Sequence, residues 1–265
     1  MSVNKKNSGA KDLLAQGIKI LRAGDKETDE LIAPRAAEII SLLENYIKEI
    51  ELFNSAYSLV GAADTDELVV KHILDSLAPL GIICRLLDAQ NNDHGKNNSA
   101  SAGLEYSIAD IGSGAGLPGI PLAIVLSDYN FTLIEKMKRR AGFLLNTQAA
   151  LSLDNITTAD CELETFAQIM SPHKTNSAKR GSAVFAGFDL ITFRAFKPLE
   201  PKLLKDLLKI RAKRGIIAAY KGKREKIEAE MTALAGVFKE QKLKWEALPC
   251  PVPFLDEERH LAVIK

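Results

Sequence analysis

The stretch with the strongest chemical signal is DIGSGAGLPGIPLAI, residues 110–124, which follows the strand-like LEYSI. It places four glycines and two prolines between a β-type run and an apolar helix. Glycine has no Cβ, so a ligand can approach the N–H groups of such a turn closely. In doubly wound sheets, ligands lie beyond the carboxyl ends of the strands. The stretch therefore predicts a ligand-binding loop after the first strand of such a sheet.

Two nucleotide-like ligands compete for this loop. A dinucleotide needs the pattern G-x-G-x-x-G at the first turn. Counted from Gly112, the third glycine falls on Leu117; counted from Gly114, the pattern fits but starts four residues beyond Asp110. S-adenosylmethionine carries no pyrophosphate, so it needs close backbone approach without an anion cradle. The spacing favours S-adenosylmethionine, and an NAD-dependent oxidoreductase remains the alternative.

Three acids stand at the ends of three successive predicted strands: Asp110, Glu135 and Asp160. Asp110 could order the loop or meet an ammonium group. Glu135 could accept hydrogen bonds from both ribose hydroxyls, although NAD enzymes also place an acid there. Asp160 lies near the expected position of adenine. The series favours a nucleoside site over three solvated strand ends.

From Leu104 onward, strand patterns alternate with helical patterns, which predicts an α/β fold with helices on both faces of a mostly parallel, seven-stranded sheet. No helical pattern separates the last two strands, so they should form a C-terminal antiparallel hairpin. The predicted strands are 105–111, 131–136, 155–160, 188–195, 215–221, 243–251 and 260–265. The predicted helices are 118–127, 137–151, 198–213 and 224–238, and LLKDLLKIRAKR should present a solvated helix face.

The first part of the chain predicts an N-terminal helical cap. Apolar residues recur at three- and four-residue spacing in 34–53, and a second helix is expected over 64–80. The stretches 89–103 and 171–183 are polar and low in complexity, and are expected to be loops. We therefore divide the chain into a cap at 1–88, a linker at 89–103 and a Rossmann-like domain at 104–265.

Composition narrows the class of protein. The 265 residues contain no apolar run long enough to span a bilayer, so we expect a cytoplasmic protein without membrane contact. Three cysteines lie far apart, and four histidines lack metal-binding spacing, so no metal site is expected. Residues 1–110 carry 11 Lys and Arg against 17 Asp and Glu, whereas 111–265 carry 24 against 17. The basic second part is compatible with a polyanionic partner. No heptad seam is present, so a monomer is expected.

Five segments in this order resemble a known family: DIGSGAGLPGIPLAI, VKHILDSL, FRAF, YKG and ERHLAVIK. They are similar to the bacterial 16S ribosomal RNA guanine-N7 methyltransferases, also called glucose-inhibited division protein B, over about residues 35–265. The resemblance implies a class I S-adenosylmethionine-dependent methyltransferase with a Rossmann-like fold. The implied partner is 16S ribosomal RNA, as free RNA, in the 30S subunit or in an assembly intermediate.

The resemblance also implies roles for individual residues. The cofactor contacts it implies, together with the acids above, are Asp110, Gly112, Ser113, Gly114, Leu117, Glu135, Asp160, Leu163, Glu164 and Arg194. Leu163 and Glu164 would flank the adenine, and Arg194 would position the substrate or the cofactor.

Basic residues that follow the strand ends should contact RNA: Lys136, Arg139, Arg140, Lys221, Lys223 and Arg224. His72, Asp75 and His260 are candidates for the edge of the pocket.

One turn departs from the family pattern W-N-x-x-x-N-L-T. This chain reads FNSAYSLV, with Phe53, Ser58 and Val60 in place of Trp, Asn and Thr. A non-catalytic RNA-binding or ribosome-assembly protein that keeps the pocket is therefore a further alternative. Guanine N7 has a lone pair and no proton, so an enzyme of this kind needs positioning and no general base.

Overall fold

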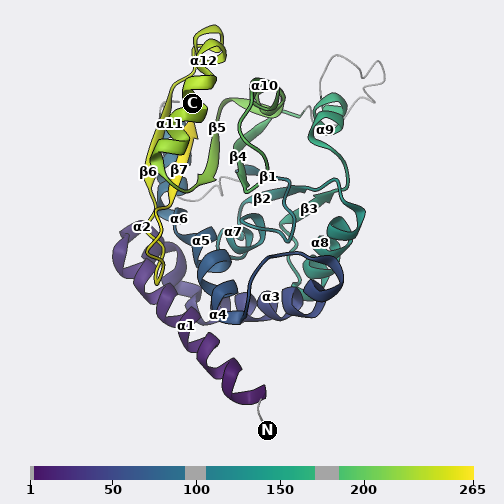
Figure 1. Ribbon diagram of the computed structural model, residues 1–265, viewed down its shortest axis with the longest axis vertical. Coiled ribbons are helices and arrows are strands. Elements are labelled where there is room, and N and C mark those ends of the chain that lie inside the picture. The colour runs from purple at the N-terminus through teal and green to yellow at the C-terminus, as the bar shows by residue number, and fades with distance from the viewer. Residues whose placement is uncertain (1–2, 93–105, 171–184) are drawn as a thin grey trace.

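The computed structural model describes residues 3–92, 106–170 and 185–265. Its centre is a seven-stranded sheet with the order β3-β2-β1-β4-β5-β7-β6 (Figure 1). The strands are β1 Ser107–Ile111, β2 Asn130–Ile134, β3 Ile156–Ala159, β4 Phe188–Arg194, β5 Arg211–Lys221, β6 Trp245–Pro249 and β7 His260–Ile264. Each overlaps one of the seven strands predicted from the sequence.

Five strands are parallel and the sheet ends in an antiparallel hairpin. β1 to β5 pair in parallel, whereas β7 pairs antiparallel with both β5 and β6. Two helices connect β5 to β6, so β6 can lie one strand away from β5. β7 returns directly from β6 and fills the place between them. The predicted α/β architecture is confirmed, and the structure adds that β7 is the inner strand of the hairpin.

The pleat of the strands divides the apolar side chains between two cores. In β1, Ile108 joins the core beneath the cap, whereas Ala109 and Ile111 join the core on the opposite face. The first face is covered by the cap together with α7 Gly119–Val125 and α8 Lys138–Leu151. The second is covered by α9 Leu163–Met170, α10 Pro201–Ile210, α11 Arg224–Ala233 and α12 Ala235–Gln241.

The cap consists of the purple and blue helices of Figure 1, of which α1, α3 and α4 lie along its lower edge. They are α1 Val3–Gly24, α2 Lys26–Ile32, a 3₁₀ turn Ala33–Arg35, α3 Ala36–Tyr57, α4 Thr65–Leu68, a π-helical turn η2 Val69–Leu74, α5 Asp75–Leu77 and α6 Leu80–Asn92. The apolar stripe predicted for α3 is buried at Ile39, Leu43, Tyr46, Ile47 and Ile50. The cap and one face of the sheet share a single apolar core.

Some predicted boundaries were wrong. α6 runs to Asn92, four residues into the predicted linker, and 93–103 and 171–183 lie outside the described residues. The helix predicted over 198–213 ends at Ile210, because Arg211 pairs with Phe188 and starts β5. The basic run at 211–214 is therefore part of a strand and not of a solvated helix face. The division into cap, linker and Rossmann-like domain stays a prediction.

No helix among the described residues combines the length and apolar character that a bilayer span requires.

A serine in the left-handed region ends α8 and gives a stability prediction. Ser152 is exposed and has φ of 53°, a conformation that costs a residue with a Cβ about 1 kcal/mol. Ser152→Gly should therefore raise the free energy of unfolding by about 0.5–1 kcal/mol in a urea titration. The matched control is exposed Ala149, inside the same helix, where Ala149→Gly should lower it by about 1 kcal/mol. Destabilisation by both changes would contradict the assigned helix end.

Candidate active site

The glycine loop lies between β1 and α7, at the carboxyl edge of the parallel strands. Gly112, Gly114 and Gly116 have φ of 65°, 62° and 91°, which few residues other than glycine adopt. The N–H groups of Gly112 and Ser113 both donate to the carbonyl of Ile134, at 2.8 and 3.2 Å. The loop therefore folds back onto the end of β2.

Asp110 fixes the loop from inside. Its carboxylate is fully buried and accepts hydrogen bonds from Ser113 Oγ at 2.6 Å and from the Gly119 N–H at 3.0 Å. Burial raises the pKa of Asp110 to about 6, against these two hydrogen bonds that lower it. Asp110 Oδ1 is buried without a partner in the described structure. Of the two roles considered from the sequence, this geometry matches ordering of the loop.

Glu135 holds the same loop from the end of β2. Its carboxylate accepts from the Gly114 N–H at 2.9 Å and from the Met137 N–H at 2.8 Å, and the residue is only 4% exposed. Each carboxylate oxygen keeps a lone pair for a further donor. A Cβ on Gly114 would lie 3.8 Å from the Gly112 carbonyl oxygen and 3.9 Å from Arg140 Nη1, which are ordinary van der Waals distances, so the backbone here has room for one more atom. A backbone with room for a close neighbour, anchored on a carboxylate, fits a nucleoside.

The other predicted cofactor residues lie on the same edge, but with different surroundings. The Glu135 N–H donates to Ala159 at the end of β3, which brings exposed Asp160 to this edge. Leu117 and Leu163 are buried in the two cores. Glu164 accepts from Lys202 Nζ at 3.0 Å, on the surface between α9 and α10.

Two contacts join the cap to the loop. Tyr46, fully buried in α3, donates to the Ala115 carbonyl at 2.6 Å. Arg140, in the first turn of α8, donates to the Ser58 carbonyl at 3.2 Å. The cap therefore packs directly on the ligand loop.

The turn that departs from the family pattern is held by its backbone. Asn54 donates to the Val60 carbonyl at 3.1 Å and accepts from the Val60 N–H at 2.9 Å. Neither bond uses the side chain at position 60. Ser58 ends α3 with φ of 48°, a conformation that asparagine adopts more readily. The change to Ser58 therefore costs local stability but leaves the hydrogen bonds of the turn in place.

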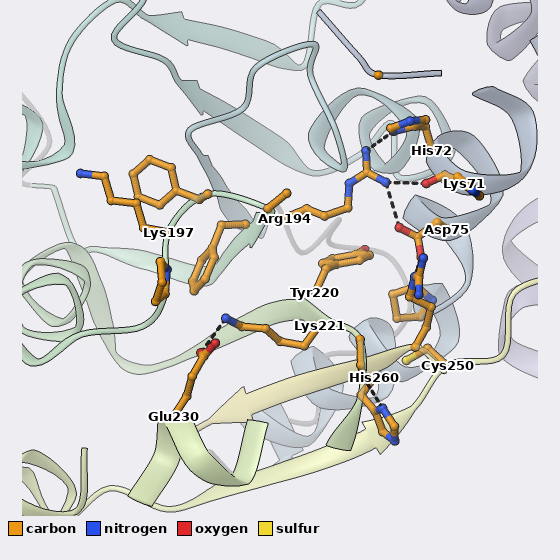
Figure 2. A pocket seen from close by; sticks show the side chains of 18 of the residues that line it. Lys71, His72, Asp75, Arg194, Lys197, Tyr220, Lys221, Glu230, Cys250 and His260 are labelled. Carbon is orange, nitrogen blue, oxygen red and sulfur yellow. Dashed lines mark hydrogen bonds and ion pairs between the residues drawn. The ribbon is translucent and has the colours of Figure 1, made fainter. Parts of the chain in front are cut away.

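Beside the loop, a cavity of about 690 Å³ opens between the ends of β4 and β5, the cap and the start of β7 (Figure 2). Its volume is in the range of small-molecule sites. The predicted residues His72, Asp75, Arg194, Lys221 and His260 all line it. The sequence analysis did not select its other charged residues and its tyrosine, which are Glu67, Lys71, Lys197, Tyr220, Glu230 and Arg259. Tyr220 and Arg259 stand inside the quoted segments YKG and ERHLAVIK, which were the available signal.

Arg194 joins the end of β4 to the cap. Its Nη1 donates to the Lys71 carbonyl at 2.9 Å and to Asp75 at 2.8 Å, and its Nη2 meets His72 Nδ1 at 2.8 Å. Figure 2 shows the guanidinium pointing toward these three residues. Arg259 Nε donates to the other Asp75 oxygen at 3.1 Å. Asp75 is buried, and loss of a buried partner of this kind costs about 3–5 kcal/mol.

His72 is held neutral by this arrangement. An arginine can only donate, so His72 Nδ1 must accept and its proton resides on Nε2. Burial, followed by the charge of Arg194, lowers the pKa of His72 to about 4. His72 belongs to the π-helical turn η2, a local irregularity that is frequent at functional sites.

Phe196 connects the glycine loop with the cavity. A Cβ on Gly112 would lie 2.1 Å from the Phe196 ring, so the ring packs directly against the loop. Phe196 also lines the cavity, and Ala195 before it has φ of 49°. Strained backbone of this kind persists where the surrounding structure fixes it. The turn after β4 therefore places one aromatic side chain at the junction of the two parts of the site.

The predicted RNA-binding residues do not have equal access to solvent. Lys136, Arg139, Lys223 and Arg224 are exposed, and Lys136 and Arg224 form surface ion pairs with Glu162 and Glu228. Arg140 is turned toward Ser58, and Lys221 is paired with Glu230 at 2.7 Å inside the cavity. Both stretches begin where β2 and β5 end, so they lie on the edge that carries the loop.

The neutral state of His72 predicts a pH dependence of stability. Its pKa in the folded protein is below that of the unfolded chain, so the unfolded chain binds more protons between pH 6.5 and 4. Stability from this group is complete near pH 7 and is lost as the pH falls. Relative to His72→Gln, which accepts from Arg194 without titrating, the native protein should lose about 1–2 kcal/mol between pH 7 and 4.5. Parallel curves in urea titrations of the two proteins would contradict a neutral His72.

The chain was compared with known protein families and with individual known proteins. Residues 39–251 match the family described as rRNA small subunit methyltransferase G. A Treponema denticola protein named ribosomal RNA small subunit methyltransferase G is 35% identical, over 97% of this chain and 96% of its own. A Treponema pallidum protein of the same name is 36% identical, over 95% of this chain and 92% of its own.

A solved structure agrees with the fold. The O-methyltransferase from Bacillus cereus, in complex with SAH, superposes with a TM-score of 0.55 and 14% identity, over 93% of this chain and 99% of its own. At this identity the likeness shows a shared class I methyltransferase fold. Because the family match spans most of the chain and the Treponema relatives align along nearly all of it, the chain belongs to the rRNA small subunit methyltransferase G family.

Proposed function

We propose that the protein is an S-adenosylmethionine-dependent methyltransferase that modifies N7 of one guanine in 16S ribosomal RNA. The observation that carries the proposal is the glycine loop, anchored on Glu135 and with room for a Cβ at Gly114, beside a cavity for a second ligand. Membership of the rRNA small subunit methyltransferase G family supports the choice of ribosomal RNA as substrate.

The residues around the loop fit the cofactor. The backbone of Gly112, Ser113 and Gly114 would face its amino acid part, and Glu135 its ribose. Asp160, with Leu163 and Glu164 at the start of α9, would flank the adenine. S-adenosylmethionine supplies an electrophilic methyl group on its sulfonium when bound. Asp110 would contribute by keeping the loop in shape.

The cavity would take the target base. Guanine N7 has no proton, so the protein does not need a base to activate it. The side chains instead hold the base and exclude water, and this positioning is worth several kcal/mol of the barrier. Arg194 is suited to a positioning role because the cap fixes its guanidinium. Its Nε–H donates to none of the described residues and would be available to the substrate.

The wider partner is proposed to be 16S RNA within the 30S subunit or an assembly intermediate, bound by a monomer. Exposed Lys138 and Arg139 at the start of α8 and Lys223 before α11 form no ion pair within the described residues. They flank the site from two neighbouring sides and would neutralise phosphates.

The anchoring carboxylate gives a cofactor prediction. Glu135→Gln removes the charge and replaces one acceptor oxygen by an amide, so it loses a hydrogen bond to the loop. Affinity for S-adenosylhomocysteine, measured by calorimetry, should fall at least about tenfold. Glu38→Gln is the control, since Glu38 is an exposed carboxylate that pairs with Arg35 on the cap. Unchanged affinity in Glu135→Gln, or binding of NADH by the native protein, would overturn the proposed cofactor site.

The exposed basic residues give an RNA prediction. Arg139→Ala and Lys223→Ala should raise the KM for RNA and leave kcat and cofactor affinity unchanged. Each should also reduce the slope of log K against log salt by nearly one. Lys26→Ala is the control, because Lys26 is exposed on α2 in the cap and pairs with Glu30. An unaltered salt slope would remove Arg139 and Lys223 from the RNA interface.

The activity itself is tested on ribosomes from cells that lack the gene. Purified protein and labelled S-adenosylmethionine are incubated with naked 16S RNA or with 30S subunits, and the RNA is digested for mass spectrometry. The expected result is one new 7-methylguanosine in at least one of the two substrates. Cofactor binding without any methyl transfer would favour the non-catalytic RNA-binding alternative.

A further inference from the structure

We propose that Lys221 and Glu230 together identify the target base as guanine. The inference rests on the proposed function, because it assigns the cavity to the base that accepts the methyl group. Lys221 is the last residue of β5, and Glu230 lies in α11. Both line the cavity, and in Figure 2 they point toward each other, apart from the group around Arg194.

Of the three acids that line the cavity, Glu230 has the greatest capacity for a ligand. Both oxygens of Asp75 are taken by Arg194 and Arg259. Both oxygens of Glu67 are also taken, by Lys71 Nζ and by the Ala63 N–H.

Glu230 uses one oxygen for both of its contacts. Its Oε2 accepts from Lys221 Nζ at 2.7 Å and from the Leu199 N–H at 3.4 Å. Its Oε1 accepts nothing among the described residues. The two side chains are 16% and 26% exposed, so they are shielded yet reachable from the cavity. An ammonium and a free carboxylate oxygen therefore stand side by side at one wall.

This order of donor and acceptor matches guanine. Along one edge, guanine presents the O6 acceptor, followed by the N1–H and N2–H donors. An ammonium can donate to O6, and the carboxylate can accept from N1–H and N2–H. Adenine presents a donor at C6 and a bare N1, so it would set like groups against each other. Such a mismatch leaves shielded polar groups unpaired and gives strong discrimination.

The aromatic lining completes the arrangement. Phe196 and Tyr220 line the same cavity, and a purine ring is suited to contact with aromatic faces. O6 and N7 are neighbours on the guanine ring. A base held at O6 by Lys221 can therefore turn N7 toward the side of the cavity where Phe196 touches Gly112.

The test combines a residue change with a base change. 16S RNA is assembled by ligation with guanine or inosine at the methylated position; inosine lacks only the N2 amino group. For the native protein, kcat/KM should fall about 10- to 100-fold with inosine. For Glu230→Gln, kcat/KM with guanosine should already be lower by a similar factor, and it should fall little further with inosine. Glu228→Gln, on the same helix but paired with Arg224, should behave as the native protein.

The outcomes separate the inference from the proposed function. Two outcomes would overturn the recognition of guanine by Glu230 while guanine methylation stands. One is an equal loss of kcat/KM with inosine in the native protein and in Glu230→Gln, and the other is no loss in the native protein. Absence of methyl transfer to any guanine RNA would overturn both. Should Glu230→Gln fail to fold in a thermal melt, Lys221→Gln is compared on 2-aminopurine, which lacks both O6 and the N1–H. If the two changes together lower kcat/KM by less than the product of their separate effects, the pair is supported. If the effects simply multiply, the pair is overturned.

Discussion

The site depends on two buried carboxylates that accept hydrogen bonds from a glycine loop. Asp110 holds Ser113 and Gly119, and Glu135 holds Gly114. A loop with three left-handed glycines has many conformations in the unfolded chain, and ordering it is costly. The carboxylates offset that cost because each hydrogen bond to a charged acceptor is stronger than a neutral one. The price is the burial of charge, which is visible in the raised pKa of Asp110.

The cap also fixes long side chains at the strand ends. An arginine side chain has many rotamers, and the positioning role proposed for Arg194 requires it to lose them before the substrate binds. Contacts with Lys71, His72 and Asp75 remove that freedom in the folded protein. Asp75 reaches Arg259 as well, so one buried carboxylate joins the cap to β4 and to the segment before β7. The cap therefore preorganises the cavity as well as covering the sheet.

The two halves of the site meet where the strand order reverses. β1 and β4 are neighbours, and the chain proceeds outward from them in opposite directions, to β2 and β3 on one side and to β5 on the other. Ligands in such folds lie at this point. The loop and Glu135 occupy one side, and the cavity with Arg194 and Lys221 occupies the other. Phe196 stands at the boundary, against Gly112.

The sequence by itself determined the elements and the loop. Alternating strand and helix patterns arise from neighbouring residues. The glycines at 112, 114 and 116 likewise meet a local need, because the backbone there has positive φ. Tertiary structure decided which partners the polar side chains take. The bonds of Arg194 to His72 and Asp75 join positions more than a hundred residues apart, and no periodicity encodes such pairing. The same holds for Lys221, selected as a surface cation but paired with Glu230 in the cavity, because helix α11 places that carboxylate only after it packs on the sheet.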